Sequence, residues 1–121
     1  MKKKFVIILL NAIIATQLIC CDSKQSEMFY INNTNDSISV INTKVCGQTI
    51  KVEALAAGDI KSANFLSKYD SSYDIEVIFT SGKKLKQKVG YVTNGICFRD
   101  TIHILQDSLM FKSKAITCNS H

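Results

Sequence analysis

A strict alternation of apolar and polar side chains over residues 73–79 constrains the fold of this chain more than any other feature. The apolar positions are Tyr73, Ile75, Val77 and Phe79. The carboxylates Asp74 and Glu76 stand between them. Because successive side chains of a β-strand point to opposite faces, this pattern predicts a strand with one buried face and one solvated face.

Residues 83–91 predict the partner strand of a hairpin, because their lysines and apolar residues also alternate. The lysines are Lys84, Lys86 and Lys88, and the apolar residues are Leu85, Val89 and Tyr91. A three-residue loop at 80–82 sets Val77 opposite Leu85, whereas a two-residue loop would set Val77 opposite Lys86 and mix the faces. Gly82 would take the left-handed backbone position that such a loop needs.

The lysines of this strand, together with Lys83, are the only charge cluster that suggests a function. The register sets Lys86 opposite Glu76 and Lys88 opposite Asp74, and so predicts exposed cross-strand ion pairs. Such a strand is typical of a solvated sheet edge that lysines protect against unwanted pairing. The alternative is a surface that attracts anionic lipid headgroups, envelope polymers or an acidic protein.

Six further segments have the composition of short strands, and turn-forming residues separate them. They are residues 28–31, 37–45, 49–55, 60–66, 100–105 and 108–111. A turn at Gln106-Asp107 would set Ile104 opposite Leu109. The chain is therefore predicted to be all-β, a small antiparallel β-sandwich of about seven to eight strands. A short helix at residues 51–57 is the minority alternative, since isolated helices of this length are marginal.

The order of these elements resembles that of immunoglobulin-like sandwiches. Leu55-Ala56-Ala57-Gly58 precedes a strand that contains Phe65, and the strand over residues 73–79 follows. The resemblance implies architecture alone, because neither a strand tryptophan nor a cysteine pair at the usual spacing accompanies it.

The first 22 residues have the pattern of an export signal. Three lysines precede an apolar run that is broken by Asn11, and the chain turns polar at Asp22. The sequence Leu18-Ile19-Cys20-Cys21 resembles the lipobox of bacterial lipoproteins, in which a Leu stands three residues before the Cys that is lipidated. Cys21 has Leu18 at that position, whereas Cys20 would have the polar Gln17. The family usually has Gly, Ala or Ser where this chain has Cys20.

The resemblance implies that the chain is cleaved before Cys21 and that Cys21 carries a lipid. Residues 1–20 would be the signal peptide, residues 21–27 the lipidated Cys and a polar tether, and residues 28–121 a single domain. The protein would face the periplasm from a membrane of the bacterial cell envelope. Asp22 resembles the inner-membrane retention signal of enteric bacteria, so the choice between inner and outer membrane depends on the host. An uncleaved anchor is the alternative, and the polar residues within the apolar run disfavour it.

Processing removes most of the positive charge of the chain. The 15 basic residues include Lys2, Lys3 and Lys4, which leaves 12 basic residues (15 minus 3) against 10 acidic ones. The mature protein is therefore near charge +2, and its charge does not indicate nucleic-acid binding.

Three cysteines remain after processing, in a compartment that permits disulfides. They are Cys46, Cys97 and Cys118, which allow three single pairings. A bond between Cys46 and Cys118 is favoured, because Cys97 has apolar neighbours and would serve as a small buried residue. No Cys-x-x-Cys or nearby His supplies the spacing of a zinc site, so we expect neither a metal nor another cofactor.

The candidate catalytic residues have simpler explanations. His103 would point away from its apolar strand neighbours, and His121 is the last residue of the sequence. The carboxylates are expected in turns or on solvated faces, and the sequence does not bring any two of them together as a hydrolase with paired carboxylates would require. They are Asp70, Asp74, Asp100 and Asp107. The sequence therefore predicts that the protein is not an enzyme.

The stretch from Tyr91 to Asp100 is the best candidate for recognition. It carries residue types that anchor protein interfaces, although aromatic residues beside turns also plug the ends of sandwiches. The candidate residues are Tyr91, Asn94, Phe98 and Arg99, with Lys84, Lys86 and Lys88 alongside. The expected function is a non-enzymatic protein-binding module, an immunity or inhibitor protein that neutralises a toxin or hydrolase. The alternatives are an accessory envelope lipoprotein and a small-ligand or glycan binder, which the absence of Trp disfavours.

Overall fold

A computed structural model describes residues 25–118 of the protein and contains eight strands in this region. They are β1 (Gln25–Asn32), β2 (Ile38–Val45), β3 (Gln48–Leu55), β4 (Ile60–Leu66), β5 (Ser71–Phe79), β6 (Lys84–Val92), β7 (Cys97–Ile104) and β8 (Leu109–Ile116). All eight correspond to strands expected from the sequence, so the all-β prediction is confirmed. The segment over residues 51–57 belongs to β3 and the turn after it, not to a helix.

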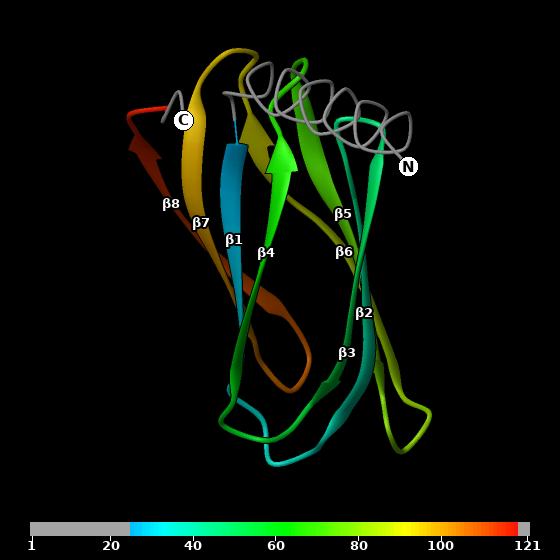
Figure 1. The fold of residues 1–121 in the computed structure, drawn as a ribbon. Coiled ribbons are helices and arrows are strands. Elements are labelled where there is room, and N and C mark those ends of the chain that lie inside the picture. Colours follow the sequence, from blue (N-terminus) through cyan, green and yellow to red (C-terminus); the bar gives the residue numbers. More distant parts are fainter. Residues whose placement is uncertain (1–24, 119–121) are drawn as a thin grey trace, which may run out of the picture.

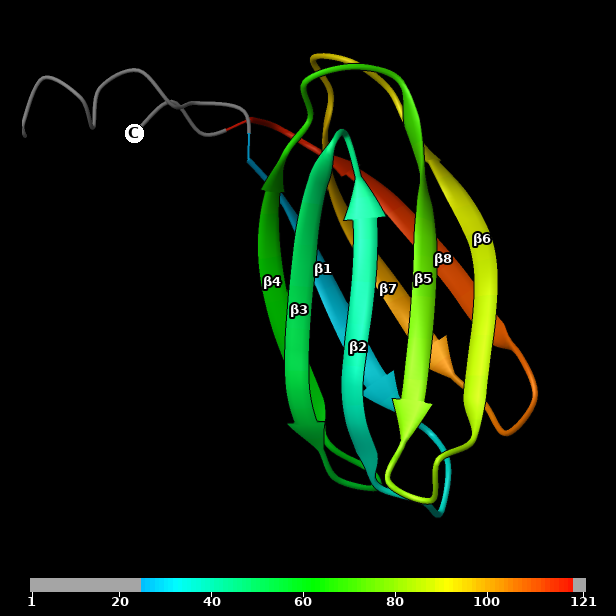
Figure 2. The ribbon, with the colours of Figure 1, turned by 90° about the vertical axis from the view of Figure 1, so that its right-hand side faces the viewer.

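The strands form two four-stranded sheets that pack face to face (Figures 1 and 2). Sheet A has the order β4-β1-β7-β8, and sheet B has the order β3-β2-β5-β6. The fold is thus the predicted β-sandwich. Five of the six strand pairings are antiparallel, whereas β1 and β7 run parallel.

The core lies between the sheets and is built from the alternating positions of both. The inward faces of β5, β2, β1 and β7 contribute most of its fully buried side chains, which include Tyr73, Ile75, Val77, Ile41, Met28, Tyr30, Ile102 and Ile104. The Tyr73 ring packs edge-on against Phe65 and at a tilt against Phe111, with both centroid distances 5.6 Å. Each such buried side chain contributes roughly 1.5–3 kcal/mol relative to an exposed one.

The hairpin of β5 and β6 has the register that the sequence predicts. Val77 pairs with Leu85, and residues 80–82 form the loop. Gly82 has φ +94°, and its N–H donates to the carbonyl of Phe79 at 2.9 Å. The expected ion pairs of Glu76 and Asp74 with Lys86 and Lys88 are not formed, since the ion pairs among residues 25–118 lie elsewhere. They are Lys51–Glu53, Lys83–Asp107 and Arg99–Glu27.

A β-bulge at the end of β6 corrects the predicted position of Tyr91. Tyr73 pairs with Val89 but Ser71 pairs with Val92, so β6 contains one extra residue there. Gly90 has φ +67°, and the Phe111 ring lies so close that a Cβ at Gly90 would come within 2.6 Å of it. The extra residue reverses the alternation, and Val92 points inward while Tyr91 points to solvent.

The structure also corrects the disulfide and the start of the domain. Cys97 is bonded to Cys118, whereas Cys46 is a free, buried cysteine, so the expected Cys46–Cys118 bond is wrong. Cys97 is buried as expected, but in a disulfide. β1 begins at Gln25 and pairs there with Leu66, so residues 25–27 belong to the sandwich rather than to a tether. The expected signal peptide and Cys21 lie outside the described residues. Within residues 25–118, no helix is long and apolar enough to cross a membrane.

Candidate functional site

Two of the expected recognition residues, Tyr91 and Asn94, meet at one loop cluster. The Tyr91 hydroxyl donates to Oδ2 of Asp70 at 3.0 Å, and the backbone N–H of Asn94 donates to Oδ1 of the same carboxylate at 2.8 Å. These bonds, that of Asn94 first, lower the pKa of Asp70, and the same carboxylate raises the pKa of Tyr91. Tyr91 is thus exposed but held in one position.

The other two residues of the expected recognition stretch lie elsewhere. Phe98 is half-buried against the core, and its backbone N–H donates to Ser26 Oγ at 2.9 Å. Arg99 lies on the outer face of sheet A, where its Nε is 3.3 Å from Glu27 Oε1. Phe98 is therefore part of the packing around the core, and Arg99 belongs to a different surface from Tyr91.

The three lysines of β6 lie on the outer face of sheet B, the opposite side of the sandwich from Arg99. They are exposed, while Gln87 between them points inward and accepts the Leu109 N–H at 3.0 Å. The cross-strand rows of this face mix charges, as in the row Lys51, Asn42, Glu76 and Lys86. A hollow of about 100 Å³ between Lys44 and Lys86 contains Asp74 and Glu76 as well. This face therefore presents lysines and carboxylates side by side rather than a continuous basic surface.

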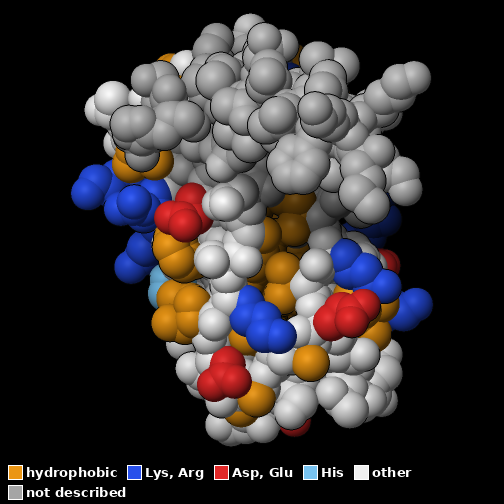
Figure 3. All heavy atoms as spheres, viewed as in Figure 1, with side chains coloured by type: hydrophobic (Ala, Val, Ile, Leu, Met, Phe, Trp, Pro, Cys, Tyr) orange, Lys and Arg blue, Asp and Glu red, His pale blue; other side chains and the backbone are white. Residues whose placement is uncertain are grey.

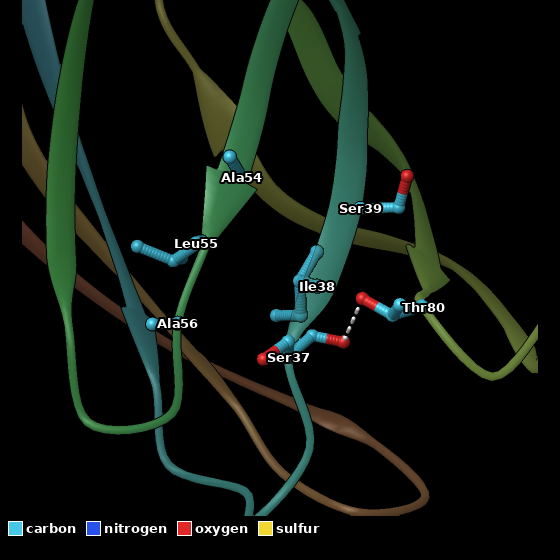
Figure 4. Close-up of a pocket in the computed structure, with 7 residues that line it drawn as sticks. All are labelled: Ser37, Ile38, Ser39, Ala54, Leu55, Ala56 and Thr80. Carbon is cyan, nitrogen blue, oxygen red and sulfur yellow. Dashed lines mark hydrogen bonds between the residues drawn. The ribbon is translucent and has the colours of Figure 1, made fainter.

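A larger hollow of about 280 Å³ opens at the end of sheet B where β2 begins and β3 and β5 end (Figure 4). Its lining residues are Ser37, Ile38, Ser39, Ala54, Leu55, Ala56 and Thr80. Ala54 has φ +55°, which is unusual for a residue other than glycine. The Thr80 hydroxyl donates to the Ser37 carbonyl at 3.1 Å. The hollow contains methyl and hydroxyl groups but no charged side chain, and it is slightly smaller than the roughly 300–1,000 Å³ of most small-molecule sites.

Two of the five large hydrophobic side chains that are exposed among the described residues, Ile60 and Met110, lie on the outer face of sheet A. Residues at the same level of β4, β1, β7 and β8 form the row Ile60, Ile31, His103 and Met110. Phe29 lies in the next row, beside Thr101. Ile60 and Met110 are exposed, and Ile31 and Phe29 are half-buried. We call Phe29, Ile31, Ile60 and Met110 the apolar patch. Four strands spaced about 4.8 Å apart give it a width of roughly 14 Å.

A basic border adjoins the apolar patch toward the start of β1. Lys112 is in the row of Phe29, and the next row carries Glu27, Arg99 and Lys114. Figure 3 shows Lys and Arg side chains gathered above hydrophobic ones along this side of the molecule. Met, Phe and Arg are residue types that are enriched in protein interfaces.

The sequence analysis named Arg99 as a candidate but did not name Ile60 or Met110, which lie on the same face. The signal was available in the alternation, because Ala63 and Phe65 point inward from β4 and Leu109 and Phe111 from β8. The residues of opposite parity, Ile60 and Met110, must then point outward.

His103 lies within the apolar row but has a structural partner. Its Nδ1 is 2.9 Å from Asn33 Oδ1, and it points outward from β7 as predicted. Among residues 25–118, no three side chains of His, Cys, Asp or Glu are placed to hold a metal ion.

Asp100 is a further correction, since it is buried rather than exposed. It lies on the inward face of β7 with Ile102. Its carboxyl group accepts one hydrogen bond from the Tyr73 hydroxyl and another from Ser113 Oγ, the latter at 2.5 Å. Burial raises the pKa of Asp100, and burial with the neighbouring carboxyl raises that of Tyr73. Nearby, Tyr30 bonds Thr43 at 2.7 Å, and burial raises the pKa of Tyr30 to about 12. These groups are enclosed in the core and are part of its packing.

The chain is similar in fold to a solved structure, the NMR structure of a protein from Eubacterium rectale. The TM-score is 0.50 and the sequence identity 19%, over 74% of this chain and 87% of that chain. At this identity the likeness shows the fold alone. No family model matches the chain, and no curated protein matches it.

Proposed function

We propose that the mature protein is a lipoprotein of a bacterial cell envelope that is anchored through Cys21 and binds another protein with the outer face of sheet A. The observation that carries the binding surface is the apolar patch with its basic border. The lipobox-like sequence Leu18-Ile19-Cys20-Cys21 supports the anchor. The partner is a protein of the periplasm, and the function is that of an immunity or inhibitor protein against a toxin or hydrolase.

The charges suggest what the partner presents to this face. Lys112, Lys114 and Arg99 border the apolar patch on one side, and Glu27 is already engaged by Arg99. A partner with an apolar projection flanked by carboxylates would bury the patch and pair with the lysines. The apolar centre would give most of the affinity, and the exposed charges would chiefly raise the association rate.

Photocrosslinking in cells that produce the full chain tests this surface. A photoreactive amino acid replaces Met110 in one variant and Lys86, which is exposed on the outer face of sheet B, in a matched control. The expected result is one protein adduct from position 110 and none from position 86. The captured protein is then purified, and adding the sandwich domain should inhibit its activity.

Each outcome bears on a different part of the proposal. Equal adducts from both positions, or none from position 110, would contradict the binding surface. A specific adduct whose activity does not respond to the domain would remove the inhibitor function and leave the binding function. Hydrolytic activity of the purified domain itself would overturn the expectation from the sequence that the protein is not an enzyme.

A further inference from the structure

The start of β1 is fixed among the loops at one end of the sandwich, the upper end in Figure 2. Ser26 Oγ bonds Ser67 Oγ at 2.6 Å and accepts the Phe98 N–H at 2.9 Å. The Gly95 N–H donates to the Ser67 carbonyl at 3.4 Å. We call this end, with the loops at residues 46–47, 67–70 and 93–96, the anchor end.

The anchor end carries three of the five large hydrophobic side chains that are exposed among the described residues. They are Tyr69, Tyr91 and Ile96, exposed by 49%, 59% and 42%. The Tyr91 hydroxyl is held by Asp70, and the Tyr69 hydroxyl approaches Gly47 where a Cβ would lie only 2.6 Å from it. The hydrogen bond to Asp70 therefore holds the Tyr91 ring in one position, and the Tyr69 hydroxyl lies against the turn at residues 46–47.

The sequence leaves little distance between the anchor end and the expected lipid. Gln25 begins β1, and Cys21 is only four residues earlier. Four residues span at most about 14 Å even when fully extended. A lipid on Cys21 would therefore hold the anchor end within the depth of the headgroup region or directly above it.

We infer that, in the lipid-anchored protein, the anchor end rests on the membrane and inserts Tyr69, Tyr91 and Ile96 among the lipid headgroups. The inference deepens the proposed function and rests on the lipidation of Cys21. Tyrosine favours this interface because its ring is apolar and its hydroxyl is polar. Exposed lysines near the same end favour anionic headgroups, and Asp70 has already accepted two hydrogen bonds. The lysines are Lys68, in the loop at residues 67–70, and Lys44 and Lys88, which lie on either side of Asp74 in one cross-strand row.

This orientation leaves the proposed partner surface accessible. Ile31, at the level of Ile60 and Met110, is six residues further along β1 than Gln25. At about 3.3 Å per residue, the apolar row lies roughly 20 Å from the membrane contact. The strands of sheet A would then run away from the membrane surface. The apolar patch would lie near the end of the sheet that is farther from the membrane.

Fluorescence quenching in reconstituted vesicles tests the inference, because the chain contains no tryptophan. The processed protein carries either Ile96→Trp or the matched control Met110→Trp, since both positions are 42% exposed. Tyr91→Trp and Ile60→Trp, at 59% and 58% exposure, form a second pair in case one variant folds poorly. The vesicles contain phosphatidylethanolamine, phosphatidylglycerol and a phosphatidylcholine with brominated chains.

The expected result is bromine quenching and a blue-shifted emission for Ile96→Trp and Tyr91→Trp, with neither change for Met110→Trp and Ile60→Trp. Equal quenching at both ends, in protein that floats with the vesicles, would overturn the inference and leave the anchor intact. Protein that does not float with the vesicles would overturn the proposed anchor, and the inference with it.

Discussion

The carboxyl of Asp100 lies in the core, where its neighbours are hydroxyl groups. Burial raises its pKa above the ordinary value of 3.8, and the bonds from Ser113 and Tyr73 oppose that shift. The folded protein therefore keeps a proton on Asp100 over a pH range in which the unfolded chain has lost it. The stability that this provides is complete below the unfolded pKa and is lost as the pH rises through the folded pKa.

Asp100→Asn should remove this pH dependence. As the pH rises above 3.8, the free energy of unfolding of the wild type should fall relative to that of Asp100→Asn. Urea unfolding of residues 22–121 over a series of pH values measures the difference.

Asp70→Asn provides a control of opposite sign. The bonds from Asn94 and Tyr91 lower the pKa of Asp70, so its contribution is present above the unfolded pKa and is lost as the pH falls. The same slope with pH for both variants would contradict the environments assigned to the two carboxyls.

At the scale of single elements, the β-bulge of β6 depends on Gly90. Alanine there would meet the Phe111 ring at 2.6 Å and would have to adopt φ +67°. Overpacking costs about 1–3 kcal/mol, in addition to roughly 1–2 kcal/mol for the left-handed backbone. Gly90→Ala should therefore lower the free energy of unfolding by more than Gly58→Ala, where φ is +81° but nothing lies within 4 Å. Equal losses in chemical denaturation would argue against the close packing of Phe111.

The disulfide joins Cys118, two residues after the end of β8, to Cys97 at the beginning of β7. Cys97 and Cys118 are 21 residues apart, and closing a loop of that length contributes about 3 kcal/mol. Reducing agent should lower the free energy of unfolding by that amount in the wild type and in Cys46→Ser, and have no effect on Cys118→Ser. Peptide mapping without reductant should recover Cys97 joined to Cys118. A peptide in which Cys46 is joined to Cys118 would contradict the structure.

Local alternation predicted much of the fold, because a strand pattern needs only neighbouring residues. The same alternation gave the register of Val77 with Leu85 and of Ile104 with Leu109, both of which are confirmed. It failed at Gly90, where an extra residue reverses the faces, and at the parallel pairing of β1 with β7. That pairing joins segments about 70 residues apart, which no local pattern specifies.

The candidate site was less predictable than the fold for the same reason. Tyr91 and Asn94 come together through Asp70, on another loop. Ile60 and Met110 become one surface only when β4 and β8 take their places in sheet A. The identity of a strand's neighbours, rather than the pattern within each strand, determines which exposed residues share a surface.

At the scale of the whole molecule, the proposals assign the membrane contact and the partner contact to different parts of the sandwich. The anchor end carries the start of β1 and the exposed rings of Tyr69 and Tyr91, and the outer face of sheet A carries the apolar patch at a distance. Both the proposed function and the membrane orientation require a lipid on Cys21.

Metabolic labelling with an alkyne fatty acid, followed by membrane fractionation, tests this requirement most directly. The wild type should be labelled and membrane-bound, and Cys21→Ser should lose both properties. Cys20→Ser should remain labelled, because Ser is usual before the lipidated Cys in the lipobox family and Leu18 keeps its distance from Cys21. An unlabelled wild type, or a Cys21→Ser variant labelled as strongly as the wild type, would contradict the account.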